Sequence, residues 1–158
     1  MRHPSLILLS HDHHHGLALA LRCRKQALGR IKPMGLQGLE ERASEVKEFF
    51  SKNLERHFQA EEEILFPAIR SCASESWQMV EDLIEEHRQI RAEVELLEEK
   101  GNLAKVLFDL GDLLERHIRR EERELFPFFE KYAAPAEAEK IKEEIEKILA
   151  GRNPKSDV

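Results

Sequence analysis

Apolar residues recur along two segments of the chain with the spacing of one face of an α-helix. In both segments, successive positions on this face are separated by four, four, three, four and four residues. Both patterns therefore predict amphipathic helices, in which a His and a Glu take positions otherwise held by Leu, Val or Phe. The first face consists of Val46, Phe50, Leu54, His57, Glu61 and Leu65, and the second of Val106, Leu110, Leu114, His117, Glu121 and Leu125.

The same two segments repeat one another in sequence. Residues 54–67 and 114–127 lie 60 positions apart, and nine of their 14 positions are identical, among them the His, the Glu and a closing Leu-Phe-Pro. A His and a Glu four residues apart lie on one helix face, roughly 6 Å from each other. A carboxylate that faces a core is costly unless it is paired or coordinates a metal. Its occurrence twice, in register, favours a shared metal.

The remaining periodicity and the turn signals predict four long helices and a short fifth one. In the third helix a His again takes a core position, within the face Val80, Leu83 or Ile84, His87, Ile90, Val94 and Leu97. Pro67 and Pro127 fall inside the second and fourth helices and are expected to kink or end them, because proline lacks a backbone donor. The predicted helices span residues 10–30, 36–71, 76–100, 103–132 and 136–150.

Length and composition fit one all-α domain. The chain has 158 residues, of which 41% are hydrophobic and 35% charged, and it contains few Gly and Pro. We therefore expect a single domain over residues 1–150, built as an antiparallel up-down four-helix bundle. The fifth helix is predicted to pack on the bundle exterior or on a second subunit, so a homodimer through this helix is one expectation. Residues 151–158 are predicted to form a flexible tail.

Charge and cysteine usage restrict the partners and the compartment. The formal net charge is −6, which argues against nucleic acid and anionic membranes as partners. Cys23 and Cys72 do not form a disulfide framework. The chain has no segment of transmembrane length and no signal-peptide pattern. These features predict a cytoplasmic protein.

Three histidines, His57, His87 and His117, fall on predicted core faces of three different helices. Together with Glu61 and Glu121 they form a set of imidazole and carboxylate groups that suits a pair of first-row transition metals. Known di-iron carboxylate bundles also place their ligands in a bundle core, but they use a Glu-x-x-His spacing. Here the spacing is His-x-x-x-Glu, which is a different motif.

This His-x-x-x-Glu pattern, taken with His14 and His87, resembles the hemerythrin-like (HHE cation-binding) domain over about residues 5 to 132. The resemblance implies a four-helix bundle that holds a non-haem di-iron centre: two iron ions (Fe²⁺/Fe³⁺) with an oxo or hydroxo bridge. Glu61 and Glu121 would bridge the irons. The terminal nitrogen ligands would be His57, His87, His117 and one His from the first helix.

The first helix offers several histidines for this last position. If His14 faces inward, then Leu17, Leu21 and Leu28 share its face, and this apolar face favours His14. If His13 faces inward, the face is the thinner one of Gly16, Ala20 and Ala27. His11 could replace or join either of them. The predicted metal ligands are thus His14, His57, Glu61, His87, His117 and Glu121.

One departure from the family changes the expected function. The oxygen-carrying hemerythrins have a second His one turn along the third helix, whereas here the positions four away from His87 are Leu83 and Arg91. A site with one fewer nitrogen favours binding or activating a small molecule over simple oxygen carriage. We predict a di-iron protein that binds or senses oxygen, nitric oxide, peroxide or a related oxidant, rather than an enzyme. The alternatives are a di-iron enzyme of oxidative or nitrosative stress or iron-centre repair, and a helical interaction module with zinc or no metal.

Overall fold

The computed structural model describes residues 1–151, apart from the side chain of residue 100. The predicted tail, from residue 152 on, lies outside the described residues. A short 3₁₀ turn (η1, Pro4–Leu6) leads into the first helix, and the remaining elements follow in the order of the sequence. The helical elements are α1 (Ile7–Ala27), α2 (Gly35–Phe49), η2 (Phe50–Leu54), α3 (Glu55–Ala60), η3 (Glu61–Leu65), α4 (Phe66–Cys72), η4 (Ser74–Ser76), α5 (Trp77–Leu96), η5 (Lys100–Asn102), α6 (Leu103–Arg120), η6 (Glu121–Leu125), α7 (Phe126–Tyr132) and α8 (Pro135–Ala150).

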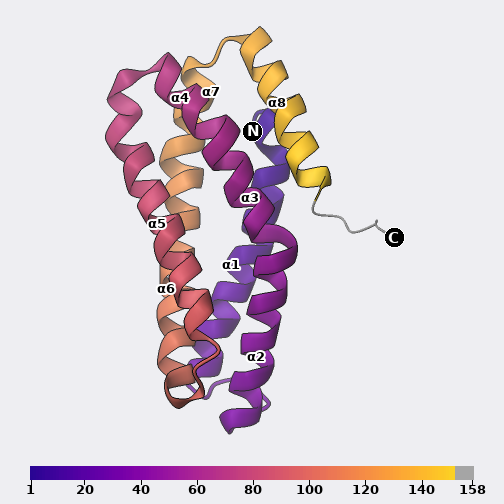
Figure 1. Cartoon of the computed structure of the whole chain (residues 1–158), viewed down its shortest axis with the longest axis vertical. Helices are drawn as coiled ribbons and strands as arrows, with labels where there is room; N and C mark the ends of the chain where they lie inside the picture. Colours follow the sequence, from indigo (N-terminus) through magenta and orange to yellow (C-terminus); the bar gives the residue numbers. More distant parts are fainter. Residues whose placement is uncertain (152–158) are drawn as a thin grey trace.

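These elements form four long helical rods that run alternately up and down (Figure 1). The rods are α1, then α2 to α4 as one continuous column, then α5, then α6 and α7 as a second continuous column. The predicted all-α bundle with an appended helix is confirmed. The first rod begins at residue 7 rather than 10, because the side chain of His3 caps the η1 turn that precedes it.

The two prolines inside the rods do not end them. Each follows a π-helical segment, η3 before Pro67 and η6 before Pro127. In these segments the N–H of the residue before the proline bonds to a carbonyl five residues back, from Phe66 to Glu61 in the first repeat. A π-helical turn inserts one extra residue into the helix and is frequent at functional sites. Both π-helical segments of this kind begin at the Glu of the repeated motif.

The helices α1 and α6 approach each other closely because small residues face one another between them. A Cβ atom built on Gly111 of α6 would lie 2.7 Å from the carbonyl oxygen of Ala20 on α1, and one on Gly16 would lie 2.7 Å from Cδ1 of Ile118. Gly111 faces backbone, which cannot move aside like the end of a side chain. This close approach fixes which face of α1 points into the bundle.

We expect Gly111→Ala to destabilise the protein by about 1 to 3 kcal/mol, because α1 and α6 must move apart. Chemical denaturation should show this as a lower midpoint with an unchanged slope. Gly101→Ala is the matched control, since a Cβ there meets nothing within 4 Å. Equal stability of the two variants would contradict the argument.

The fifth predicted helix, α8, packs on its own chain. It runs beside α3, η1 and η3 at the upper end of the bundle (Figure 1). Its apolar residues Ile141, Ile145 and Leu149 are buried there. The apolar face is therefore covered within one subunit, and a homodimer through this helix stays a prediction.

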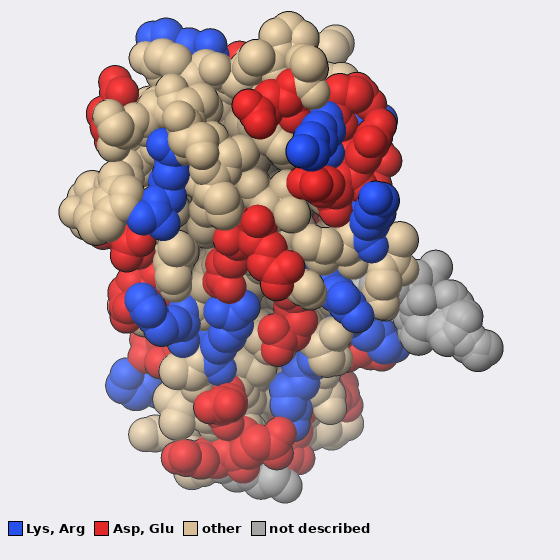
Figure 2. Space-filling model, turned by 45° about the horizontal axis from the view of Figure 1, so that its top comes forward, with Lys and Arg blue, Asp and Glu red and all other residues tan. Residues whose placement is uncertain are grey.

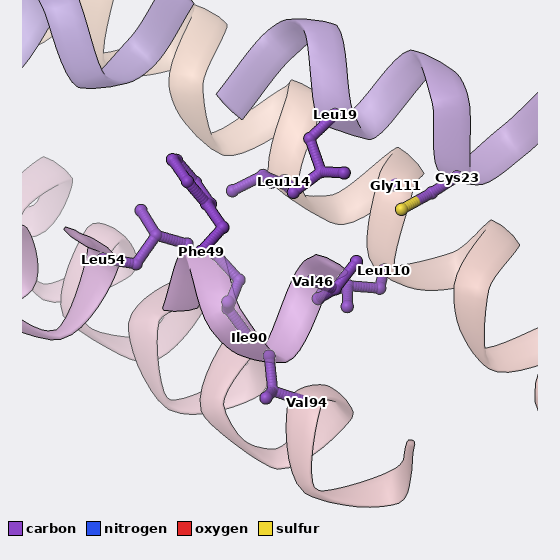
Figure 3. Close-up of a pocket in the computed structure, with 10 residues that line it drawn as sticks. All are labelled: Leu19, Cys23, Val46, Phe49, Leu54, Ile90, Val94, Leu110, Gly111 and Leu114. Atoms are coloured by element: carbon purple, nitrogen blue, oxygen red, sulfur yellow. The ribbon is translucent and has the colours of Figure 1, made fainter. Parts of the chain in front are cut away.

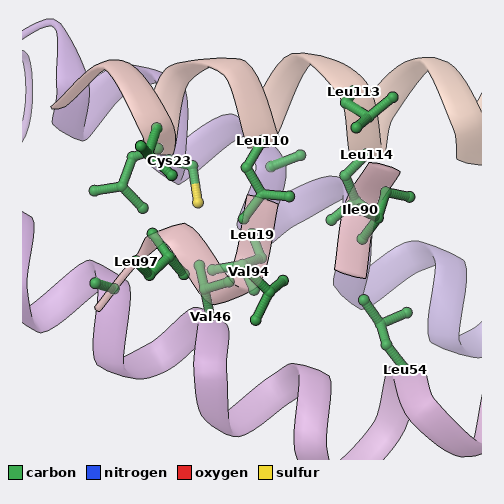
Figure 4. Packing of buried hydrophobic residues seen from close by; sticks show 14 of the residues in the cluster. Leu19, Cys23, Val46, Leu54, Ile90, Val94, Leu97, Leu110, Leu113 and Leu114 are labelled. Carbon is green, nitrogen blue, oxygen red and sulfur yellow. The ribbon is translucent and has the colours of Figure 1, made fainter. Parts of the chain in front are cut away.

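Two apolar clusters fill the interior at different heights. The lower one joins α1, α2, α5 and α6 around Leu19, Val46, Ile90 and Leu110 (Figure 4). The upper one joins α4, α5, α7 and α8 around Phe66, Leu83, Phe129 and Ile141. Of the two residues considered for the third helix, Leu83 is buried and Ile84 is only partly buried. A buried polar cluster lies between these two apolar regions.

Charged side chains of both signs alternate over the face of the molecule shown in Figure 2. Many are paired along one helix at a spacing of four residues, such as Lys105 with Asp109 at 2.6 Å and Arg119 with Glu115 at 2.8 Å. Such exposed pairs contribute little each, about 0 to 1 kcal/mol. No helix in the described part of the chain has the length and apolar character needed to cross a membrane.

Candidate metal centre

Six buried side chains from all four rods meet between the two apolar clusters. Each has 2% or less of its surface exposed. Four are imidazoles and two are carboxylates, and the carboxylates stand at the start of the π-helical segments η3 and η6. The six residues are His13 on α1, His57 on α3, Glu61 in η3, His87 on α5, His117 on α6 and Glu121 in η6.

The six side chains divide into two groups that share both carboxylates. In the first group His13 Nε2 lies 2.9 Å from Glu121 Oε1, and His57 Nε2 lies 3.0 Å from Glu61 Oε2. In the second group His87 Nε2 lies 3.0 Å from Glu61 Oε1, and His117 Nε2 lies 3.1 Å from Glu121 Oε2. Each carboxylate thus gives one oxygen to each group.

The ligand atoms within each group lie within 4.8 Å of one another. Metal–nitrogen and metal–oxygen bonds are about 2.0–2.2 Å long, so neighbouring ligands of one ion lie roughly 3 Å apart. The four contacts above match this spacing. Two ions bridged by Glu61 and Glu121, each with two terminal imidazoles, would therefore fit the side chains present.

The buried polar atoms at the centre of this cluster also lack other partners. Among the described residues, Nε2 of His13, His87 and His117 makes no hydrogen bond, and neither do both oxygens of Glu121 and Oε1 of Glu61. Several of these atoms are near one another but misaligned for hydrogen bonding. Buried polar atoms without partners are rare and costly. A metal pair would satisfy all six.

In each imidazole, the nitrogen that points away from the centre of the cluster, Nδ1, hydrogen-bonds a carboxylate. The Nδ1 of His87 donates to Glu62 at 2.6 Å, and that of His13 to Glu122 at 2.6 Å. The Nδ1 of His117 donates to Glu86 at 2.7 Å, and that of His57 to Asp12 at 3.0 Å. Such pairing fixes the tautomer and directs Nε2 toward the metal.

Arginines near the surface bind three of these four supporting carboxylates. Arg91 Nη1 lies 3.1 Å from Glu62, Arg120 Nη1 lies 3.4 Å from Glu86, and Arg2 Nη2 lies 3.0 Å from Glu122. Each carboxylate is thereby fixed from both sides. The orientation of the imidazoles consequently depends on contacts that extend to the protein surface.

Loss of a supporting carboxylate should weaken metal binding without removing a ligand. We expect Glu86→Ala to lower the affinity of the group that contains His117 by about 10- to 100-fold. Competition with a chromophoric chelator would measure this affinity. The adjacent Glu85→Ala is the matched control, because Glu85 is exposed and, among residues 1–151, its one ion pair is with Arg88 on the surface. Equal metal affinity of the two variants would contradict a supporting role.

The carboxylates around the four imidazoles raise the pKa values of all four. For His87, burial alone would lower the pKa, but the nearby carboxylates of Glu121, Glu61 and Glu62 more than offset burial and raise the pKa to about 10. The pKa values of His13, His57 and His117 are raised for the same reasons. Burial would raise the pKa of Glu121, but the neighbouring imidazoles, His117 first, hold it well below its usual range.

The prediction that His14 faces the core is wrong. His14 is exposed and lines a surface hollow together with Arg2 and Glu130, whereas His13 is 2% exposed and joins the cluster. The Leu face that favoured His14 lies outward, with Leu21 45% and Leu28 53% exposed. The small residues beside His13 point inward because only they permit the close approach of α6.

The structure brings the other five predicted residues together. Of the supporting carboxylates, Glu62 and Glu122 occupy matching positions of the sequence repeat, and each contacts both an imidazole and an arginine. Asp12 and Glu86 were missed. Glu86 directly precedes His87 in sequence but binds His117 on another helix, so no spacing along the chain indicates the contact.

The fold and the cluster define a class: a four-helix bundle with a candidate dinuclear histidine–carboxylate metal centre. The sequence model of a protein family, the hemerythrin HHE cation binding domain, matches residues 5–129 of the chain and, in a second match, residues 78–151. The chain belongs to this family. No curated protein and no solved structure matched it.

Proposed function

We propose that the protein binds two iron ions between Glu61 and Glu121 and uses them to bind or sense a small oxidant such as oxygen, nitric oxide or peroxide. The observation that carries this proposal is the sharing of both carboxylates between two groups of two imidazoles. When bound, the iron pair supplies reversible exchange of electrons between the ferrous and ferric states.

The ligand types favour iron as the metal, and their number leaves coordination positions open for an added ligand. Imidazole and carboxylate together suit iron, and iron sites with few protein ligands and open positions are typical of proteins that react with oxygen. Each group here offers four protein atoms. Of the two positions one turn from His87, Leu83 is fully buried in the upper apolar cluster and Arg91 pairs with Glu62, so neither adds an imidazole.

Aromatic rings exclude water from the centre. Phe58 stacks on His87 with ring centroids 3.8 Å apart, and Phe126 stacks on His13 at 5.3 Å. Both rings are 1% exposed or less. A dry surrounding strengthens electrostatic contacts at the centre and protects a reactive bound molecule from water.

A small apolar cavity lies one turn below the centre (Figure 3). Leu54, Ile90 and Leu114 line it, and each lies three residues from a cluster histidine. The space within it that the centre of a water-sized sphere can occupy is about 10 Å³, and its lining is entirely apolar. Apolar cavities of this kind stay dry and take up apolar molecules. This supports an uncharged diatomic molecule as the ligand.

The first test is the metal content and absorption spectrum of protein purified without a tag or chelator. We expect about two irons per chain and a charge-transfer absorption that is lost in the His57→Ala/His117→Ala double variant. Zinc, or no metal, after growth with ample iron would refute the proposal. Reduced protein should then take up oxygen or nitric oxide stoichiometrically, whereas sustained turnover would indicate an enzyme.

Filling the cavity tests whether the diatomic ligand passes through it to reach the iron pair. Leu110→Phe should leave the iron content unchanged and slow the uptake of the diatomic ligand, at a cost of about 1 to 3 kcal/mol of stability from overpacking. Stopped-flow absorption would measure the uptake rate. Leu36→Phe is the control, since Leu36 is 56% exposed on α2. An unchanged rate in the cavity variant would exclude this route.

A cytoplasmic location belongs to the same proposal. Cys23 is buried and Cys72 is exposed, and both are free thiols, which suits a reducing compartment. The absence of nucleic acid and membrane partners remains a prediction that rests on the net charge of −6.

A further inference from the structure

Two histidines that the metal centre does not use lie together on the outer side of α1. His11 and His15 are both exposed and four residues apart. Their ring centroids are 5.1 Å apart, and the ring planes are nearly perpendicular, at 88°. Two histidines at this spacing on one helix face are the arrangement that holds zinc in the His-Glu-x-x-His motif.

We propose that His11 and His15 form a second, surface metal site that takes a divalent ion such as zinc. In the described part of the chain neither imidazole makes a hydrogen bond or an ion pair, and the one ring–ring contact of each is with the other. This differs from His13, which is engaged at both nitrogens by carboxylates. No protein group therefore competes for the nitrogens that a metal would need.

The chemistry of this pair differs from that of the buried centre. Two imidazoles without a carboxylate suit zinc, copper and nickel, and water would complete the coordination. An ion reaches an exposed pair without any opening of the bundle, so it binds and leaves freely. The surface site is thus expected to bind more weakly than the buried centre and to leave the buried centre undisturbed.

The pair also flanks residues that serve the buried centre. Asp12, which supports His57, and His13 lie in the helical turn between His11 and His15. An ion bound by both histidines would stabilise the helical conformation of this turn. The surface site and the buried centre nevertheless use different side chains, and the proposal for one does not depend on the other.

Zinc titration of the full chain, with its buried centre filled by the metal present after purification, tests the proposal. A chromophoric zinc chelator would report the affinity, and elemental analysis before and after would report the resident metal. We expect one added zinc per chain with no loss of resident metal. His11→Ala and His15→Ala should each weaken zinc binding at least about ten-fold.

His14→Ala is the matched control. His14 is exposed on the same helix and lies three residues from His11, but His11 makes its ring contact with His15, so the proposed pair does not include His14. Zinc affinity should be unchanged in this variant. Zinc affinity equal to that of the unmodified protein in the His11→Ala and His15→Ala variants, zinc uptake only as the resident metal leaves, or no zinc uptake would each overturn the proposal.

Discussion

Replacing Glu121 with alanine should release both metal ions at once. One oxygen of this side chain faces the group of His13 and His57, and the other faces the group of His87 and His117. No terminal histidine serves both groups in this way. We expect the metal affinity of both positions to fall at least about a hundred-fold, since loss of merely supporting residues costs 10- to 100-fold.

Two further variants make this prediction specific. Glu121→Gln keeps the volume of the side chain but removes the charge, so loss of both metals in this variant separates ligand loss from misfolding. Glu124→Ala is the matched control on the same π-helical segment, because its side chain is 59% exposed. His13→Ala, in contrast, should empty only one position. Full metal content in both Glu121 variants, by elemental analysis, would refute a bridging role.

Metal binding should tighten steeply as the pH rises above neutrality. Without a metal the pKa of His87 is about 10, so this imidazole is protonated at pH 7, and the pKa values of the other three imidazoles are shifted in the same direction. A metal needs the neutral imidazole, so each bound ion must displace protons. Each displaced proton makes the apparent affinity change about ten-fold per pH unit. The increase should continue up to about pH 10, the pKa of His87, and level off above it.

The stability of the metal-free fold should follow the opposite trend. A histidine whose pKa is raised on folding stabilises the fold below the unfolded value of about 6.5, and this contribution disappears as the pH rises through the folded value. Melting temperatures of metal-free protein should therefore fall between pH 7 and 10 while chelator competition shows tighter metal binding. A metal affinity that is flat over this range would contradict protonated imidazoles in the metal-free site.

The sequence predicted the bundle and most of the candidate site for a definite physical reason. Periodicity states which residues share a helix face, and a core face that contains His57 and Glu61 requires a compensating partner for the carboxylate. The repeat 60 residues later placed His117 and Glu121 in the same setting. These are local properties of the chain, so they can be read without knowing how the helices pack.

Periodicity does not state which of two plausible faces packs inward when both contain a histidine. The choice of His13 over His14 was made by the packing of α6, because a Cβ atom on Gly111 would lie 2.7 Å from the Ala20 carbonyl oxygen and one on Gly16 would lie 2.7 Å from Cδ1 of Ile118. The supporting contact from Glu86 to His117 likewise joins two helices. The sequence by itself determined the helices, the buried faces of the second, third and fourth predicted helices, and five residues of the polar cluster. Only the tertiary structure decided which face of α1 packs inward, which carboxylates hold the imidazoles, and how two carboxylates are shared, because these depend on distances between helices.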